Sequence, residues 1–199
     1  MQTIAQLEPL GTDETGVTAV EFGFIAPVFM LLLLATFDLG HQMYATAIVQ
    51  GALQEAARGS TLENGLAQST NINAKLTASI RNVVPNANVV ITRRNYANFQ
   101  GVRSPEEWTD GNNDGVCNDG EFFEDLNFNG RWDRDRGRDG MGGARDAVLL
   151  TASVTYNRMF GAAGLTPIGR QVTIKGVTVL RNQPYDDQNA RAPVPGSCT

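Results

Sequence analysis

The segment GVTAVEFGFIAPVFMLLLLATF, residues 16–37, decides the fold, because it is long and apolar enough to form a membrane-spanning helix. Its charge-free part, residues 22–37, would cover about 24 Å as a helix, less than the roughly 30 Å hydrocarbon core of a bilayer. Adding residues 17–21 extends this helix to about 31 Å and brings in one carboxylate, Glu21. We therefore expect a single membrane anchor.

A secretory signal and a buried core helix are the alternatives for this segment. A secretory signal carries a positive start and a small-residue cleavage site after its apolar run. This chain has no Lys or Arg before Arg58, and the apolar run is followed by Thr36, Phe37 and Asp38. These features favour an uncleaved anchor over a secretory signal.

The helical pattern continues past the apolar run, with apolar residues recurring every four positions to about residue 56. Arg58 followed by Gly59 is typical of a helix end, so one helix of about 40 residues is expected. Periodicity predicts a second helix at residues 70–84, which Pro85 ends.

Alternating apolar residues predict three short strands, at residues 89–93, 147–156 and 171–180. In the last of these the alternation changes phase at Gly176, which indicates a bulge. We expect an α+β fold in which the long N-terminal helix and a second helix pack on a small antiparallel sheet. A long insertion at about residues 98–145 separates the first two strands.

The charge and histidine content exclude several function classes. The chain has 21 acidic and 16 basic residues, a net charge of −5, and a single histidine, His41. An acidic chain of this kind is a poor nucleic-acid binder. One histidine excludes a His/Cys zinc cluster and, unless His41 itself serves, a Ser-His-Asp triad. We expect no enzymatic activity.

The acidic residues are concentrated in the insertion. Residues 106–135 hold ten acidic residues and two arginines, a net charge of −8, which leaves +3 for the rest of the chain. Within this stretch, residues 110–121 match the twelve-residue calcium-loop pattern, with Gly115 at the sixth position, where the chain must turn sharply. The expected ligands are Asp110, Asn112, Asp114, the carbonyl of Val116, Asn118 and the bidentate Glu121.

A second, incomplete loop begins at residue 125. Its expected ligands are Asp125, Asn127, Asn129, the carbonyl of Arg131, and Asp133. The twelfth position is Arg136, which does not ligate a cation, so Glu121 or Glu124 would have to close this site from outside. One calcium ion is expected and a second is a candidate. The alternative is a disordered Asp/Asn/Gly-rich linker that binds nothing.

The two cysteines, Cys117 in the first loop and Cys198 near the C-terminus, are 81 positions apart. In an oxidising compartment they would form a disulfide that stabilises the fold by about 4–5 kcal/mol in the chain-entropy model. Two unpaired thiols are the alternative, because sequence does not place the two Cα atoms.

The start of the anchor resembles a type IV prepilin processing site. Gly16 lies six residues before Phe22, and Glu21 is the fifth residue after that glycine. Pro27 in the apolar run, the Ala-rich residues 50–58 and the pattern at 181–185 are similar to the TadE-like proteins of tight-adherence pilus systems.

This resemblance implies that a prepilin peptidase cuts after Gly16, so that Val17 becomes the amino terminus. Glu21 would then neutralise the amino terminus of a neighbouring subunit. The implied function is that of a structural minor pilin or pseudopilin, with other pilin subunits and the inner-membrane assembly platform as partners. The implied location is the inner membrane, with the C-terminal domain in the periplasm, or an extracellular pilus.

The expected organisation is a leader at 1–16, an anchor helix at 17–59, an α+β domain at 60–183 and a flexible tail at 184–199. The alternative function is that of a membrane-tethered, calcium-dependent adhesin or binding module without a pilus. In both functions the protein binds calcium and catalyses no reaction.

Overall fold

The computed structural model describes residues 15–61, 68–160, 169–184 and 192–199. The chain divides into two compact units, Met1–His41 with Arg158–Arg170, and Gln42–Asn157 with Gln171–Thr199. Positions 1–14 of the expected leader lie outside the described residues.

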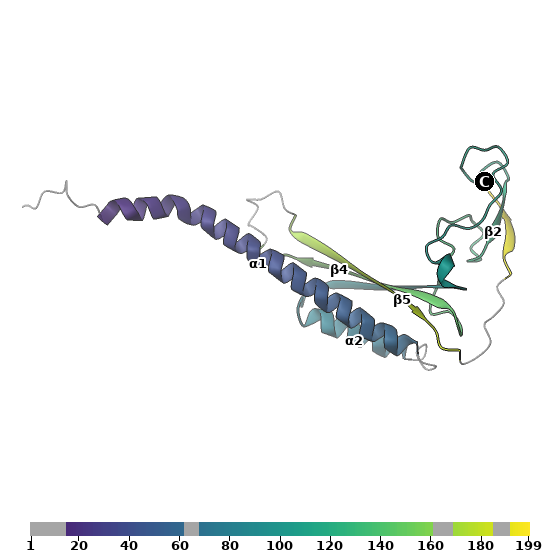
Figure 1. Ribbon diagram of the computed structural model, residues 1–199, viewed down its shortest axis with the longest axis horizontal. Coiled ribbons are helices and arrows are strands. Elements are labelled where there is room, and N and C mark those ends of the chain that lie inside the picture. Colours follow the sequence, from purple (N-terminus) through teal and green to yellow (C-terminus); the bar gives the residue numbers. More distant parts are fainter. Residues whose placement is uncertain (1–14, 62–67, 161–168, 185–191) are drawn as a thin grey trace, which may run out of the picture. The chain divides into compact units, whose positions relative to one another are not determined.

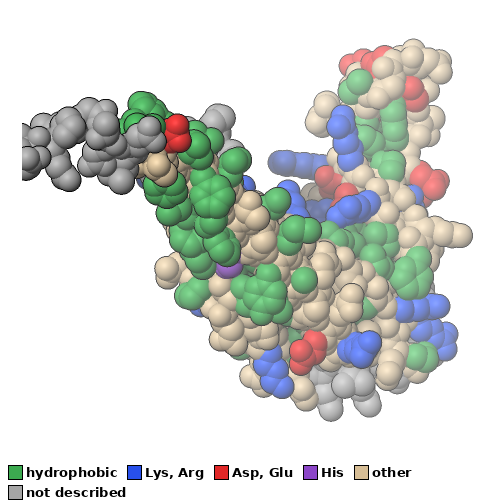
Figure 2. All heavy atoms as spheres, turned by 60° about the vertical axis from the view of Figure 1, so that its left-hand side comes forward, with side chains coloured by type: hydrophobic (Ala, Val, Ile, Leu, Met, Phe, Trp, Pro, Cys, Tyr) green, Lys and Arg blue, Asp and Glu red, His purple; other side chains and the backbone are tan. Residues whose placement is uncertain are grey.

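The first unit holds the N-terminal part of α1 (Thr15–Ser60), a helix of 46 residues. By length and composition, α1 is a candidate to cross a membrane. Large apolar side chains are exposed along this part of the helix (Figure 2). The hydroxyl of Thr36 donates to the Leu32 carbonyl at 2.8 Å, which satisfies that polar group within the helix. A helix surface with exposed apolar side chains and internally satisfied polar groups is better suited to lipid than to water.

The second unit is built on a four-stranded antiparallel sheet of order β3-β1-β4-β5. Its strands are β1 (Asn88–Tyr96), β3 (Arg138–Asp139), β4 (Ala147–Asn157) and β5 (Gln171–Arg181). The helix α2 (Ser69–Arg81) precedes β1, and a short 3-10 helix, η2 (Phe99–Gly101), follows it. The predicted α+β class is confirmed.

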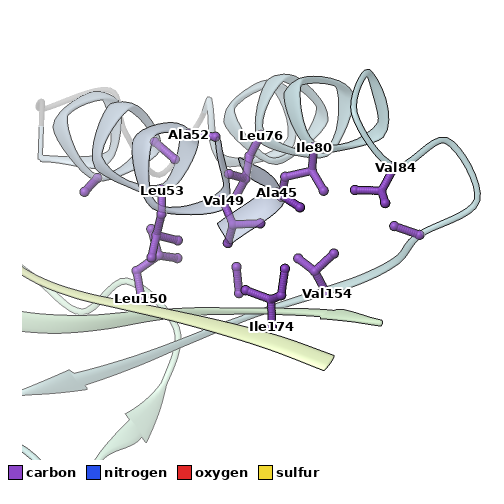
Figure 3. Packing of buried hydrophobic residues seen from close by; sticks show 14 of the residues in the cluster. Ala45, Val49, Ala52, Leu53, Leu76, Ile80, Val84, Leu150, Val154 and Ile174 are labelled. Atoms are coloured by element: carbon purple, nitrogen blue, oxygen red, sulfur yellow. The ribbon is translucent and has the colours of Figure 1, made fainter. Parts of the chain in front are cut away.

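The core of this unit lies between the two helices and one face of the sheet (Figures 1 and 3). From α1, small and branched residues reach the sheet, including Ala45, Val49 and Leu53, all at most 1% exposed. Leu76 and Ile80 of α2 extend the same cluster. The side chains meet Leu150, Val154 and Ile174 of β4 and β5 (Figure 3).

The predicted bulge at Gly176 is wrong. The pairing of β4 with β5 runs without interruption, and Gly176 faces Ala152 in register. A Cβ added at Gly176 would lie 3.0 Å from Cγ1 of Val49 and 3.3 Å from Cδ2 of Leu53. The glycine therefore keeps the strand regular and lets α1 approach closely, while the apolar Val177 points to the exposed face.

A second, two-stranded sheet pairs β2 (Phe122–Asp125) with β6 (Val194–Ser197). The expected flexible tail at 184–199 thus contains a paired strand. Short strands of four residues carry too little periodicity to be recognised without their partners.

The close approach at Gly176 predicts the effect of a substitution there. Gly176→Val should lower the free energy of unfolding by about 1–3 kcal/mol, because the added side chain overpacks the contact with α1. The neighbouring Val177→Thr, on the exposed face, should change it by about 0.5 kcal/mol or less. Thermal unfolding of the full chain in detergent, followed by circular dichroism, measures both. Equal melting temperatures for the two variants would contradict this packing.

Candidate functional site: two acidic loops joined by a strand

The insertion is organised around β2, which links the two sequence-predicted loops. Loop 1, residues 110–121, ends where β2 begins, and loop 2, residues 125–133, starts at the last residue of β2. One edge of β2 pairs with β6. The other edge pairs with residues 107–109. The amide of Thr109 donates to the carbonyl of Phe122 at 2.9 Å, and the amide of Glu124 donates to the carbonyl of Glu107 at 2.8 Å.

Asp110 holds the first turn of loop 1. Its Oδ1 accepts from the amide of Asp114 at 3.2 Å, and its Oδ2 accepts from the amide of Gly115 at 3.0 Å. Gly115 has a φ of 76°, the left-handed conformation that the sixth position of a calcium loop requires. The chain therefore wraps around the carboxylate as the twelve-residue pattern predicts.

The other polar side chains of loop 1 converge on one carboxylate. Oδ2 of Asp114 accepts from the side-chain amides of Asn112, at 3.1 Å, and Asn118, at 2.8 Å. The hydrogen bond from Asn118 and that from the amide of Val116 lower the pKa of Asp114. Glu121 closes the loop from its twelfth position. The structure thus brings together the side chains that the sequence assigned to this loop.

Loop 2 repeats this arrangement. Oδ2 of Asp125 accepts from the amide of Gly130 at 2.7 Å, and Gly130 has a φ of 78°. The side-chain amides of Asn127 and Asn129 both donate to Oδ2 of Asp133. In each loop the side chains at the third, fifth and ninth positions are two asparagines and one aspartate. The aspartate is at the fifth position in loop 1 and at the ninth position in loop 2.

Loop 2 is closed by Glu106, a residue that the sequence reasoning missed. Its carboxylate accepts from amides of loop 2, its carbonyl accepts from Nε1 of Trp132 at 2.9 Å, and its amide donates to the carbonyl of Asp133 at 2.9 Å. Burial, with a smaller contribution from the charge of Asp125, raises the pKa of Glu106. The expected candidates, Glu121 and Glu124, do not take this place, since Glu121 is bound to loop 1.

Strand pairing explains how Glu106 reaches loop 2. Trp108 forms an antiparallel bridge with Phe123. Continuing this register by two residues sets Glu106 opposite Asp125, the first residue of loop 2. Two features of the sequence could have indicated this role of Glu106. Loop 2 lacks a ligand at its twelfth position, and Glu106 is an acidic residue just before loop 1.

The donors in both loops suit a hard cation. Among the described residues, no three His, Cys, Asp or Glu side chains form a metal cluster by themselves. Each loop instead mixes carboxylates with Asn amides and a backbone carbonyl, that of Val116 or Arg131, and calcium takes this kind of all-oxygen set. Within the described part of the chain, neither carbonyl accepts a hydrogen bond.

A polar contact links the insertion to the sheet. Nη1 of Arg94 lies 2.8 Å from Oδ2 of Asp135, and the hydroxyl of Tyr96 donates to Oδ1 of Asp135 at 2.9 Å. Burial and the hydrogen bond to Asp135 raise the pKa of Tyr96 to about 12. The Tyr96 hydroxyl, protonated at neutral pH like that of any tyrosine, therefore keeps donating to Asp135 at more alkaline pH as well.

A disulfide between Cys117 and Cys198 joins loop 1 to the C-terminal tail, with the two Cα atoms 5.5 Å apart. The backbone continues the same attachment, since Gly120 donates to the carbonyl of Cys198 at 3.0 Å and Cys198 donates to that of Glu121 at 2.8 Å. Loop 1 is thus held by a covalent bond and by an extension of the β2–β6 ladder.

This attachment predicts that Cys198→Ser loosens the end of the chain. The amides of Gly120 and of residue 198 should exchange hydrogen faster, because the opened tail is no longer restrained; the chain-entropy model sets the loss at up to about 4–5 kcal/mol. Ser197→Ala leaves the disulfide intact and should exchange like the wild type. Wild-type exchange in Cys198→Ser would show that the disulfide does not restrain the tail.

The residues of the expected processing site lie at the start of α1. Gly16, Val17 and Glu21 are exposed in its first two turns. Among the described residues, no basic side chain pairs with Glu21.

One comparison with known proteins finds a match to this helix. The family model of TadE-like proteins matches residues 16–58, which is nearly all of α1. No curated protein and no solved structure matches the chain. The insertion with its two loops lies outside the family match. The N-terminal helix of this chain is therefore similar to that of TadE-like proteins, a pilus-associated family of structural proteins.

Proposed function

We propose that this protein is a TadE-like minor pilin or pseudopilin, anchored in the inner membrane with its C-terminal domain in the periplasm. It acts in pilus assembly or adhesion with other pilin subunits and the inner-membrane assembly platform. The observation that carries this proposal is the family match over residues 16–58, on a helix whose N-terminal part exposes apolar side chains.

The isolated carboxylate of Glu21 supports processing after Gly16. A charged side chain within a membrane helix costs on the order of 2.5–3.5 kcal/mol when it is unpaired. Cleavage after Gly16 by a prepilin peptidase creates an ammonium group at Val17, one turn before Glu21. In an assembly, the carboxylate of one subunit neutralises the ammonium of its neighbour, which fixes the register between the two.

Processing can be tested by the intact mass of the chain after co-expression with an active prepilin peptidase. The wild type should yield a form that begins at Val17, and Gly16→Val should block the cut. Gly23→Val is the matched control, since Gly23 is an open glycine in the same helix and should not affect cleavage. Uncut wild type beside an active peptidase would favour the alternative, a membrane-tethered calcium-dependent adhesin.

We also propose that loop 1 binds a structural calcium ion. Its carboxylates, amides and free backbone carbonyl supply the oxygen ligands, and the ion offsets part of the −8 charge of residues 106–135. Calcium would order a segment whose charges otherwise repel one another. The side chains of Asp110, Asn112, Asp114, Asn118 and Glu121, with the carbonyl of Val116, are the ligands.

Calcium titration of the full chain in detergent, by calorimetry, tests loop 1. Glu121→Gln should remove one bound ion, because it replaces the bidentate carboxylate. Glu124→Gln is the matched control, since Glu124 is an exposed residue of β2 and should leave binding unchanged. Absence of binding to the wild type up to millimolar calcium would refute this part of the proposal.

A further inference from the structure

We propose that Glu106 completes loop 2 as a second calcium site, in the role that Glu121 has in loop 1. The inference rests on the calcium binding proposed for the first loop. It assigns a ligand that lies outside the continuous twelve-residue pattern, 19 positions before Asp125.

The two glutamates, Glu121 and Glu106, hold their loops in the same way. Oε1 of Glu121 accepts from the amides of the second and third residues of loop 1, at 2.6 and 3.4 Å, and Oε2 accepts from the ninth, at 3.3 Å. Oε1 of Glu106 accepts from the second and third amides of loop 2, at 2.9 and 3.3 Å, and Oε2 from the ninth, at 3.0 Å. Each oxygen serves the same positions in both loops.

Two buried carboxylates, those of Glu106 and Asp125, lie at the centre of loop 2. The side chains of Glu106 and Asp125 are 1% and 4% exposed. Among the described residues, neither has a basic side chain within 4.0 Å. Buried charges are normally paired with an opposite charge or coordinate a metal, and a second like charge nearby adds to the cost. Each carboxylate accepts backbone amides of loop 2, and a bound cation would add the positive charge that offsets the two neighbouring carboxylates.

Two side-chain amides also face the centre of loop 2. The side-chain NH2 groups of Asn127 and Asn129 point to the same oxygen of Asp133. Their Oδ1 atoms accept from the backbone amides of Asn129 and Arg131, so a half-turn of each side-chain amide would be needed to present these oxygens to a cation. Together with the carbonyl of Arg131 and two oxygens from Glu106, the set matches calcium, which accepts a bidentate carboxylate and high coordination. The smaller Mg²⁺ demands a strict octahedron.

Calorimetric titration of the full chain in detergent with CaCl2 tests the proposal. The wild type should bind two ions, Glu121→Gln one, and Glu106→Gln one. Glu107→Gln is the matched control, because Glu107 is the exposed neighbour of Glu106 and should leave two ions bound. The ion retained by Glu106→Gln also reports that the insertion is folded. The same titrations with MgCl2 should show no tight second site.

Each other outcome is decisive. Two ions at wild-type affinity in Glu106→Gln overturn the proposal. If the wild type binds one ion and Glu121→Gln binds none, the second site is refuted and the calcium site in loop 1 is supported. If the wild type binds no ion, both calcium proposals are refuted. If Glu106→Gln loses both ions, a second variant, Asn129→Ala, distinguishes a lost ligand from a misfolded insertion. Asn129 is an exposed residue at a ligand position of loop 2. Loss of one ion there supports the second site, and two ions at wild-type affinity refute it.

Discussion

The contact between α1 and the sheet is the interaction on which the folded unit depends. Val49 and Leu53 are fully buried, and they lie against the bare backbone of Gly176 in β5. Because one face of the sheet is covered by α1 and α2, the core consists largely of alanine and branched side chains at close approach. The same helix exposes apolar side chains in its N-terminal part, where a lipid environment would cover them. One helix therefore covers the core and is also the candidate membrane anchor.

In the calcium binding that we propose, the insertion depends on a different constraint, which is the neutralisation of its negative charge. A strand of four residues, β2, holds the two loops in sequence, and the disulfide of Cys117 with Cys198 attaches the first of them to the chain end. Two calcium ions would reduce the charge of residues 106–135 from −8 to about −4. If calcium binds there, the acidic residues of the protein serve mainly to order residues 106–135. The rest of the chain has a net charge of +3.

The sequence predicted the elements whose periodicity is long and regular. These were α1, α2, β1, β4 and β5. The side chains expected as ligands within each loop lie close together, and calcium binding by them stays a prediction. The phase change at Gly176 was misread as a bulge, because the apolar Val177 lies on the exposed face. Glu106 was missed because its place depends on the pairing of residues 107–109 with β2, which is a long-range contact. The strand β6 was missed for the same reason, since it exists only through its partner.

In the function that we propose, α1 is a pilin-type helix whose leader is removed after Gly16, and not a membrane anchor that keeps residues 1–16. The N-terminal residue of the chain, recovered from the membrane of cells that make it with their own prepilin peptidase, tests this most directly. N-terminal sequencing should give Val17 as the first residue. A chain that still carries residues 1–16 in the presence of the active peptidase would contradict the claim.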